Sequence, residues 1–238
     1  MRLLELSPRL RAVAGLVPPG ARLADVGTDH AYLPVCLVQR GVIPGAIASD
    51  LRPGPLERAR ATLERYGITQ GQIQLRLCDG LAGIQPEEAD AVTIAGMGGE
   101  TIAAILAAAP WTRRGSRSLI LQPMSAQEDL RRWLGENGYT IEREVLSREG
   151  ETLYLALLAR PGSMPPMTPA QLWAGRQGGG QEEPLRLAYL EHLLGRARRA
   201  AEGLGRSSRP GDAARLEEMR QVMDGLTEMM EEWKAWQR

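Results

Sequence analysis

The stretch LADVGTDH, residues 23–30, leads an apolar run into an acidic residue, a glycine and a second acidic residue. A short strand that ends in Asp-x-Gly and opens a helix is typical of the nucleotide-binding turn of Rossmann-like sheets, where Gly27 lets a ligand approach the backbone. A dinucleotide site needs more glycines for its pyrophosphate, whereas this loop places Asp29 where a phosphate would be repelled. The acidic loop favours a ligand with cationic groups, such as the sulfonium and ammonium of S-adenosylmethionine. Taken alone, the string also fits an ordinary strand-to-helix turn.

Strand and helix patterns alternate around this loop through residues 1–160, which we expect to form one domain. The expected strands are 21–26, 45–49, 73–77, 90–95, 118–121, 139–146 and 152–159, and the expected helices are 9–16, 33–39, 56–66, 100–109 and 126–136. This alternation predicts an α/β fold with a mostly parallel sheet, and the last two strands predict an antiparallel hairpin at its edge. Ligands of such sheets bind outside the carboxyl ends of the strands.

Carboxylates follow three successive expected strands, at Asp25, Asp50 and Asp79-Gly80. Asp50 is placed to accept the hydroxyls of a ribose, and Asp79 to accept from an adenine amino group. Each one alone also fits a helix cap or a surface turn. Three carboxylates at three strand ends together favour a nucleoside-type cofactor.

The fourth expected strand runs into the loop Ala95-Gly96-Met97-Gly98-Gly99. If a sheet of this kind binds S-adenosylmethionine, this loop is expected to lie beside the methyl group that is transferred. Its glycines allow cofactor and substrate to approach the backbone, although a flexible turn is the plainer interpretation. Met97 either lines the site or packs against it. His30 contacts the cofactor, orients Asp29 or packs at the start of a helix.

Residues 161–238 are expected to form a second domain, a proline- and glycine-rich linker around a short helix followed by a helical hairpin. Apolar residues recur three and four apart in both arms, and an Arg-Pro-Gly turn at 209–211 separates them. The expected seam consists of Leu187, Leu190, Leu194, Ala197, Ala201 and Leu204 with Leu216, Met219, Met223, Leu226, Met230 and Trp233. Met229 and Trp236 are expected to be exposed, and they either pair two chains or reflect loose packing, so a monomer and a weak homodimer both remain open.

The composition limits the classes of function. The 29 basic and 29 acidic residues give no global field for nucleic acid, so any RNA contact must be local. Two cysteines in apolar runs predict buried thiols in a reducing cytoplasm rather than a disulfide scaffold. No signal peptide or membrane span is expected, and two distant histidines, of which His192 is expected to be solvated, argue against a metal site.

Several strings together resemble the bacterial tRNA (adenine-22, N1)-methyltransferase family over most of residues 5–160. They are LADVGTDHAYLPV (23–35), IASDLRPGPLERA (47–59), LCDGL (77–81), IAGMGGETI (94–102) and LILQPMSAQEDLRRWL (119–134), with SPRL (7–10) and EGETLYLAL (149–157). The resemblance implies a class I methyltransferase Rossmann-like sheet, S-adenosylmethionine as methyl donor, tRNA as substrate and a C-terminal antiparallel coiled-coil hairpin. With it, the expected cofactor site comprises Arg9, Asp25, Gly27, Thr28, Asp29, His30, Asp50, Leu51, Asp79, Gly80, Ala95, Gly96 and Met97.

Methylation at N1 of adenine uses an in-plane lone pair, so no base has to deprotonate it first. The product is cationic, which makes Asp29 and Gln122 the candidate catalytic residues, although Gln122 also fits a buried amide bonded to backbone. N1 lies on the Watson–Crick edge, so the target must be unpaired or extruded. Tyr32 is a candidate to stack on the target adenine, although a core position is the plainer interpretation of this residue. Gly98 is a candidate to let the adenine approach the backbone.

Basic residues gather on the first arm of the hairpin, where residues 184–209 hold six Arg and two Glu. Arg196, Arg198 and Arg199 are the candidate tRNA contacts, because RNA binding needs phosphate neutralisation. The plainer interpretation is that the acidic second arm neutralises the first. The surface is expected to extend over Arg206 and Arg209 and over Arg9, Arg113, Arg114, Arg117, Arg131 and Arg132.

Three other functions remain open from the residues alone. A small-molecule methyltransferase would retain activity without residues 162–238. A non-catalytic RNA-binding protein would transfer no methyl group. An NAD-dependent oxidoreductase is disfavoured by the single glycine of the first turn.

Overall fold

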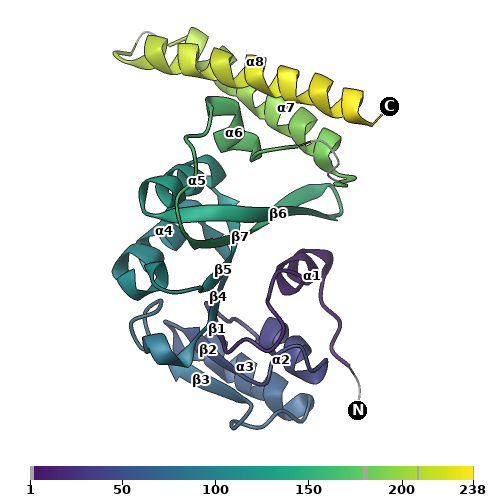
Figure 1. Ribbon diagram of the computed structural model, residues 1–238, viewed down its shortest axis with the longest axis vertical. Helices are drawn as coiled ribbons and strands as arrows, with labels where there is room; N and C mark the ends of the chain where they lie inside the picture. The colour runs from purple at the N-terminus through teal and green to yellow at the C-terminus, as the bar shows by residue number, and fades with distance from the viewer. Residues whose placement is uncertain (1–2, 179–181, 208, 238) are drawn as a thin grey trace. The chain divides into compact units, whose positions relative to one another are not determined.

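The computed structural model describes residues 3–178, 182–207 and 209–237 (Figure 1). Gly179, Gly180 and Gln181 of the expected linker, and Ser208 of the expected turn, lie outside the described residues. The chain divides into two compact units. The first combines Met1–Ala126 with Trp133–Met164, and the second combines Gln127–Arg132 with Pro165–Arg238.

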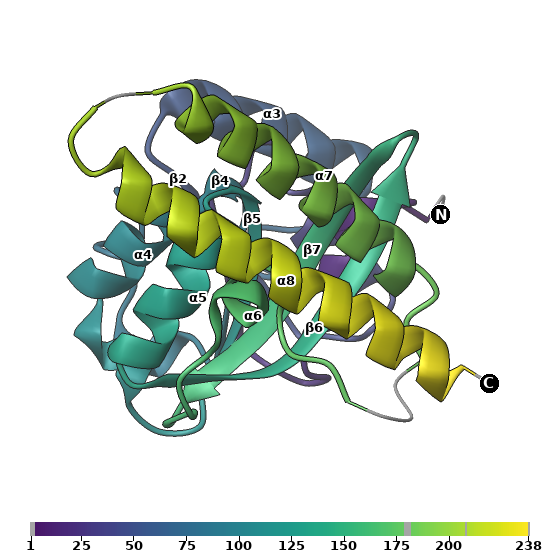
Figure 2. The same cartoon turned by 90° about the horizontal axis from the view of Figure 1, so that it is seen from above.

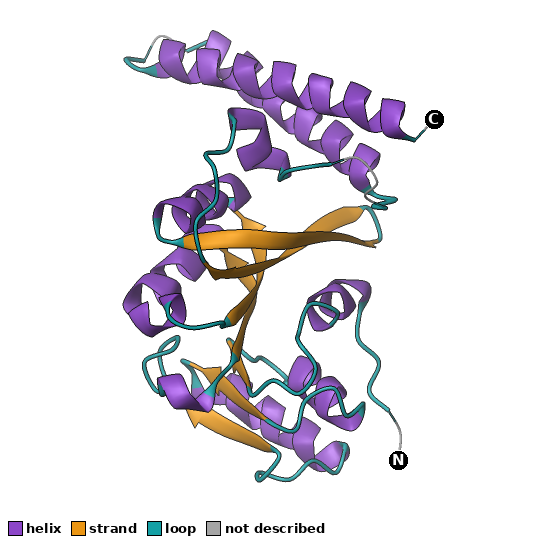
Figure 3. Cartoon of the chain, in the orientation of Figure 1, coloured by secondary structure: helices purple, strands orange, loops and turns teal. Residues whose placement is uncertain are grey.

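A seven-stranded sheet forms the first unit, in the order β3-β2-β1-β4-β5-β7-β6 (Figure 3). Its strands are β1 Leu23–Val26, β2 Ala46–Asp50, β3 Ile73–Leu77, β4 Ala91–Gly98, β5 Ser118–Ser125, β6 Tyr139–Glu149 and β7 Thr152–Pro161. The first five strands pair in parallel, and β7 pairs antiparallel with both β5 and β6. The Rossmann-like sheet with an antiparallel edge is therefore confirmed.

The helices of this unit follow the expected order with shifted ends. They are α1 Pro8–Ala14, α2 Tyr32–Gln39, α3 Pro53–Arg65 and α4 Gly99–Ala108, with short 3-10 turns at Pro86–Glu88 and Pro110–Arg113. Helix α5 Gln127–Glu136 is divided, because its residues up to Arg132 belong to the second unit. Ser7 caps α1, its hydroxyl accepting from Leu10 N at 3.4 Å. Helix α3 begins three residues earlier than expected, because proline is tolerated in a first helical turn.

Strands β4 and β5 also run further than expected, to Gly98 and Ser125. They continue because they pair with each other through an irregular register, with Ala95 opposite Gln122 and Gly98 opposite Ser125. This extension carries the glycine loop and Gln122 together at the carboxyl edge of the sheet.

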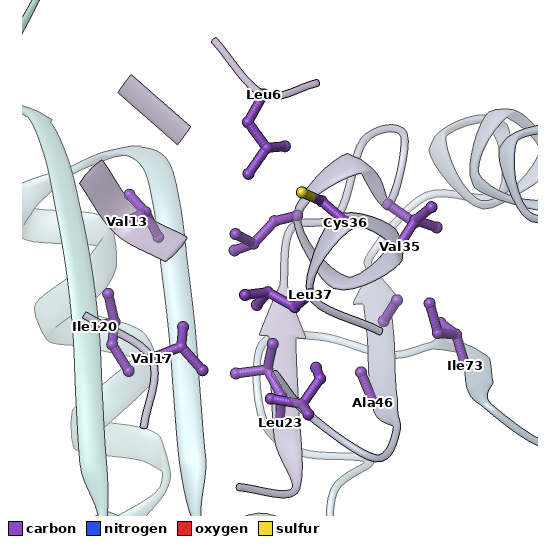
Figure 4. Close-up of a cluster of buried hydrophobic side chains, with 14 of the residues drawn as sticks. Leu6, Val13, Val17, Leu23, Val35, Cys36, Leu37, Ala46, Ile73 and Ile120 are labelled. Atoms are coloured by element: carbon purple, nitrogen blue, oxygen red, sulfur yellow. The ribbon is translucent and has the colours of Figure 1, made fainter. Parts of the chain in front are cut away.

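The core of the first unit packs helices onto the centre of the sheet (Figure 4). All four residues of β1 are buried, as expected for a central parallel strand. Leu23, Val35 and Ile73 are at most 3% exposed. Cys36 is buried and Cys78 is half-buried, so the expectation of two buried thiols is correct for Cys36 only.

The second unit combines the first part of α5 with α6 Pro169–Ala174, α7 Arg186–Gly205 and α8 Asp212–Trp236. Helices α7 and α8 lie side by side in both views of the ribbon, which confirms the helical hairpin (Figures 1 and 2). Leu190, Leu194 and Ala197 are buried in α7, and Leu226 and Trp233 in α8, as the heptad pattern predicts.

The hairpin also buries residues outside its predicted two-helix seam, whereas Met219, Met223 and Met230 of that seam are only half-buried. Met229, expected to be exposed, is 7% exposed, and Val222 is also buried. Helix α6 explains this, because a Cβ built on Gly225 would lie 2.6 Å from the Cβ of Ala170. Val222 and Met229 lie one turn to either side of Gly225 on the same helix face. Trp236 is 41% exposed, as expected.

Two buried arginines hold the end of α6. Arg131 Nη1 donates to Leu172 O at 2.7 Å and Trp173 O at 3.0 Å. Arg186 Nη1 donates to Ala174 O at 2.5 Å, and its Nη2 donates to Gly175 O at 3.2 Å. The expectation that Arg131 extends a basic surface is therefore wrong, because its side chain is fully buried against the carbonyl end of a helix.

Among the described residues, no helix combines the length and apolar character of a membrane span. In the same part of the chain, no three histidine, cysteine or acidic side chains gather as a metal site would require.

Candidate functional site

A cavity of about 520 Å³ lies at the carboxyl ends of β1, β2 and β4. Its lining brings together most of the residues that the sequence predicts to hold a cofactor, and we call it the strand-end cavity. The predicted residues in its wall are Arg9, Asp25, Gly27, Thr28, Asp29, His30, Tyr32, Asp50, Ala95, Gly96 and Met97. The lining does not include five other predicted residues, namely Leu51, Asp79, Gly80, Gly98 and Gln122.

Gly27 shapes the floor of the strand-end cavity. Its φ is +76°, a conformation that favours glycine. The N–H groups of Gly27 and Thr28 both donate to Ser49 O, at 2.8 and 2.9 Å, which ties the loop to β2. A Cβ on Gly27 would lie 2.1 Å from the Cε of Met97. Met97 therefore both lines the cavity and packs on Gly27, so its two interpretations hold together.

Asp25 supplies a buried carboxylate to the cavity wall. The side chain accepts a hydrogen bond from Thr93 Oγ1 at 2.6 Å. Burial raises the pKa of Asp25, and the hydroxyls of Thr93 and Thr28 act in the opposite direction. A cation in the cavity would stabilise the charged form of this carboxylate.

Asp29 lies at the mouth of the cavity with 60% of its side chain exposed. It pairs with Arg58, whose Nε donates to Asp29 Oδ1 at 3.0 Å, and its Oδ2 is 3.5 Å from His30 Nε2. His30 stacks on Tyr32, with ring centroids 4.9 Å apart and an interplanar angle of 7°. Tyr32 is 41% exposed, so the interpretation of Tyr32 as a core residue is wrong.

Gln122 is fully buried behind the glycine loop. Its Oε1 accepts from Arg9 Nη1 at 2.7 Å and from Gly96 N at 3.0 Å, and its Nε2 donates to Pro123 O at 3.2 Å. These contacts fit the interpretation of a buried amide. A catalytic role for Gln122 stays a prediction, and its contacts show that it positions Arg9 and the glycine loop.

Glu149 anchors Arg9 from the other side. Its Oε1 accepts from Arg9 N at 2.7 Å, and the Arg9 guanidinium lies 5.7 Å from the centroid of the Tyr154 ring. Hydrogen bonds lower the pKa of Glu149, and the bond from the Ser7 hydroxyl has a larger effect than the bond from the Arg9 N–H. Sequence reasoning missed Glu149 and Arg58 as contributors to the site. Only the family-like strings covered them, because they lie far along the chain from their partners.

The two remaining strand-end carboxylates differ in exposure. Asp50 has only 11% of its side chain exposed and accepts from Arg52 N at 2.8 Å through Oδ1. Asp79 is exposed, and Gly80 adopts a φ of +51° beside it. Contacts of Leu51, Asp79 and Gly80 with a cofactor remain predictions.

The predicted RNA contacts of the second unit fall into two groups. Arg196 lies 5.0 Å from the ring of Trp173 and 3.9 Å from Glu128, so its own unit holds it. Arg198 and Arg199 are exposed and form no ion pair within the described part of the chain. The basic side chains of α8 pair with acids of the same helix, such as Arg220 with Glu217. His192 is exposed, as expected.

The strand-end cavity fits a cofactor that is both a nucleoside and a zwitterion. Gly27 and Gly96 form a cradle that a Cβ would fill or strain, since their φ angles are +76° and +79°. Asp25 and Asp50 provide carboxylates for hydroxyl and cationic groups, and Arg9 provides a guanidinium for an anionic group. S-adenosylmethionine presents all three kinds of group.

Comparisons with known proteins agree with this geometry. Residues 6–157 match the family model of a methyltransferase domain. The tRNA (adenine(22)-N(1))-methyltransferase of Bacillus subtilis is 43% identical over 162 residues, which is 68% of each chain. The crystal structure of the B. subtilis m1A22 tRNA methyltransferase TrmK aligns with a TM-score of 0.83 at 33% identity, over 95% of this chain and 99% of that one. A putative tRNA (m1A22) methyltransferase of Streptococcus pneumoniae, solved with S-adenosyl-L-methionine, aligns with a TM-score of 0.78 at 33% identity, over 92% of this chain and 100% of that one.

Proposed function

The chain belongs to the bacterial tRNA (adenine-22, N1)-methyltransferase family, and we propose on that premise that it methylates N1 of adenine 22 in tRNA with S-adenosylmethionine as donor. One observation of the structure carries the proposal. The strand-end cavity unites an acidic β1 loop, the β2 carboxylate Asp50 and the glycine loop of β4. This arrangement would hold a nucleoside cofactor, and Gly96 and Met97 belong to the same cavity wall.

Particular residues would hold each part of S-adenosylmethionine. Asp50 would accept the ribose hydroxyls, Arg9 would bind the carboxylate, and Asp25 lies where positive charge is stabilised. The cofactor supplies an electrophilic methyl group carried by a sulfonium. The chain would supply alignment, since Met97 packs against Gly27 and the two residues limit the width of the cavity.

The target nitrogen needs no base, so the protein acts through position and charge. As the methyl group is transferred, the adenine ring becomes cationic, and the exposed carboxylate of Asp29 is placed at the cavity mouth to stabilise it. We expect Asp29→Ala to lower kcat strongly and Asp29→Asn to lower it less. Normal turnover in both variants would remove Asp29 from the mechanism.

The target adenine has to leave its stack to present N1. Tyr32 offers a half-exposed ring at the cavity mouth, already aligned by its stack on His30. An aromatic ring at that place can receive the extruded base.

The second unit provides basic side chains for the tRNA backbone. Arg198 and Arg199 are the best candidates, because they are exposed and without an ion pair among the described residues. We expect the double variant Arg198→Ala/Arg199→Ala to raise KM for tRNA and reduce the salt dependence of binding by about two phosphate contacts. Arg220→Ala serves as the control, because Arg220 is paired with Glu217. If the salt dependence of tRNA binding is unchanged in the double variant, Arg198 and Arg199 do not contact the tRNA phosphates.

The activity is tested with unmodified bacterial tRNA and labelled S-adenosylmethionine, followed by digestion and mass spectrometry of the nucleosides. We expect 1-methyladenosine at position 22. Labelled small molecules but unlabelled tRNA would favour a small-molecule methyltransferase. Cofactor binding without transfer to any acceptor would favour an RNA-binding protein. A tRNA substrate supports the proposal of a cytoplasmic location, and the state of the protein as a monomer or a weak homodimer stays a prediction.

A further inference from the structure

A second cavity of about 370 Å³ adjoins the strand-end cavity in the first unit. It lies between the N-terminal segment at Leu4, the start of α2 and the outer face of α3, and we call it the α3 cavity. His30 and Tyr32 line both cavities. A molecule seated by the glycine loop can therefore extend past this aromatic pair into the α3 cavity.

The lining of the α3 cavity combines aromatic rings with guanidinium groups. The parallel His30–Tyr32 pair forms one wall, and Arg58, Arg65 and Tyr66 contribute from α3 and its end. The Arg65 guanidinium lies 5.8 Å from the centroid of the Tyr66 ring. Aromatic rings for base stacking and arginines for phosphates are the groups that proteins use to hold single-stranded nucleic acid.

The charges around the α3 cavity identify which arginine is available. Arg58 is already paired with Asp29, and Glu5 is the acidic residue among the lining side chains. Arg65 is exposed and forms no ion pair within the described ranges of the chain. Its positive charge is the one left for an anionic group.

We infer that the α3 cavity binds a nucleotide adjacent to the target adenine, with its base against Tyr66 and its phosphate at Arg65. This inference rests on the proposed function. When adenine 22 is extruded, the shared backbone carries its neighbour along, and a cavity that shares a wall with the reaction site lies in its path. Stacking on an aromatic ring accepts any base, so the subsite contributes affinity without reading sequence.

Substitution of Arg65 tests the subsite without touching the strand-end cavity. We expect Arg65→Ala to raise KM for tRNA roughly tenfold, as the loss of a phosphate contact does, with kcat and the Kd of S-adenosylmethionine within about twofold of wild type. Arg65→Lys should retain most of the affinity, because it keeps the charge. Arg60→Ala is the matched control, since Arg60 is exposed on the same helix and lines neither cavity. Thermal unfolding of each variant checks the fold.

Photo-crosslinking of the wild-type protein provides a test that needs no variant. A tRNA with 4-thiouridine at position 21 or 23 should crosslink to residues 61–66, a segment that lines the α3 cavity and not the strand-end cavity. Crosslinks from both positions that map only elsewhere would overturn the subsite. Methylation by wild type with equal KM values for Arg65→Ala and Arg60→Ala would also overturn it, while leaving the proposed function intact. No methylation by wild type would overturn the proposed function and the subsite together.

Discussion

Charged side chains are buried in both units, but they serve different partners. In the first unit, Asp25 is 6% exposed in the wall of a cavity, and burial raises its pKa. In the second unit, Arg131 and Arg186 are buried against four backbone carbonyls at the end of α6. A buried charge thus indicates a ligand site only where part of the group faces a cavity.

The two arginines follow from the geometry of helix ends. The last carbonyls of a helix have no partner within it and carry partial negative charge. Helix α6 is only six residues long and most of its end is covered, so it needs donors from elsewhere. Arg131 and Arg186 supply them, whereas the carboxylates of the first unit leave room for a ligand.

The largest expected effect is on the second unit. Arg131→Ala removes two donors from buried carbonyls and should lower the free energy of unfolding by about 3 kcal/mol. Urea unfolding followed by tryptophan fluorescence measures it. Arg132→Ala is the control, because the exposed Arg132 forms surface ion pairs with Asp129 and Glu218, and its loss should cost less than about 1 kcal/mol. An equal decrease in the free energy of unfolding for both variants would show that the buried Arg131 stabilises the second unit no more than a surface arginine does.

Asp50→Ala should act on binding and leave stability almost unchanged. Loss of charged hydrogen bonds to ribose hydroxyls should raise the Kd of S-adenosylmethionine roughly 30-fold, or about 2 kcal/mol. Isothermal titration measures the affinity, with Glu64→Ala on the exposed face of α3 as control. If Asp50→Ala lowers the free energy of unfolding but binds S-adenosylmethionine normally, Asp50 has a structural role, as Arg131 and Arg186 have in the second unit.

Gly27→Ala should affect both properties, because it strains the backbone and displaces Met97. A positive φ costs an L-residue about 1 to 2 kcal/mol, and the collision with Met97 Cε should raise the cofactor Kd about tenfold. Gly20 separates the two causes, since its φ is +77° and a Cβ there would meet nothing within 4 Å. Gly20→Ala should therefore destabilise the fold and leave the Kd unchanged. An altered Kd in that control would mean that strain alone weakens binding.

The smallest expected effect belongs to a surface pair away from both cavities. Arg76 lowers the pKa of Glu88 to about 2 by hydrogen bonding. Because the folded-state pKa is lowered, the pair stabilises the fold above about pH 4.5 and the contribution is lost as pH falls toward 2. Glu88→Gln should cost about 1 kcal/mol or less at neutral pH, since the pair is partly exposed.

Unfolding curves of Glu88→Gln and wild type at pH 7, 4.5 and 3 test this sign. The two proteins should converge as the pH falls. The neighbouring Glu87→Gln, which removes an exposed side chain without an ion pair among the described residues, controls for the lost charge. A difference that widens in acid would contradict the assignment.

The sheet and most of the strand-end cavity could be predicted because their signals are local. Each strand end carries its own Asp or Gly, and the parallel arrangement brings those ends to one edge without further information. Residues that act across the chain could not be found this way. Arg58 reaches Asp29 from α3, and Glu149 reaches Arg9 from β6.

The second unit shows the same limit in its packing. A heptad pattern predicts contacts between two helices, and it located the hairpin correctly. The pattern gives no sign that a third helix, α6, packs on the hairpin. It therefore predicts that Met229 is exposed and does not indicate that Val222 is buried. For Arg131, the buried carbonyls that bind it lie 41 and 42 residues away in sequence.

The amide oxygen of Gln122 has a practical consequence for shortened versions of the chain. That single atom accepts from Arg9 and from Gly96, so it joins the N-terminal segment to the glycine loop. Trimming the first dozen residues would remove one of the two donors that the oxygen satisfies, together with the buried Leu4 and Leu6 of the core. Such a protein would lose core packing and a support of its binding loop at once, so its lost affinity for the cofactor would not identify a defect in the cofactor residues themselves.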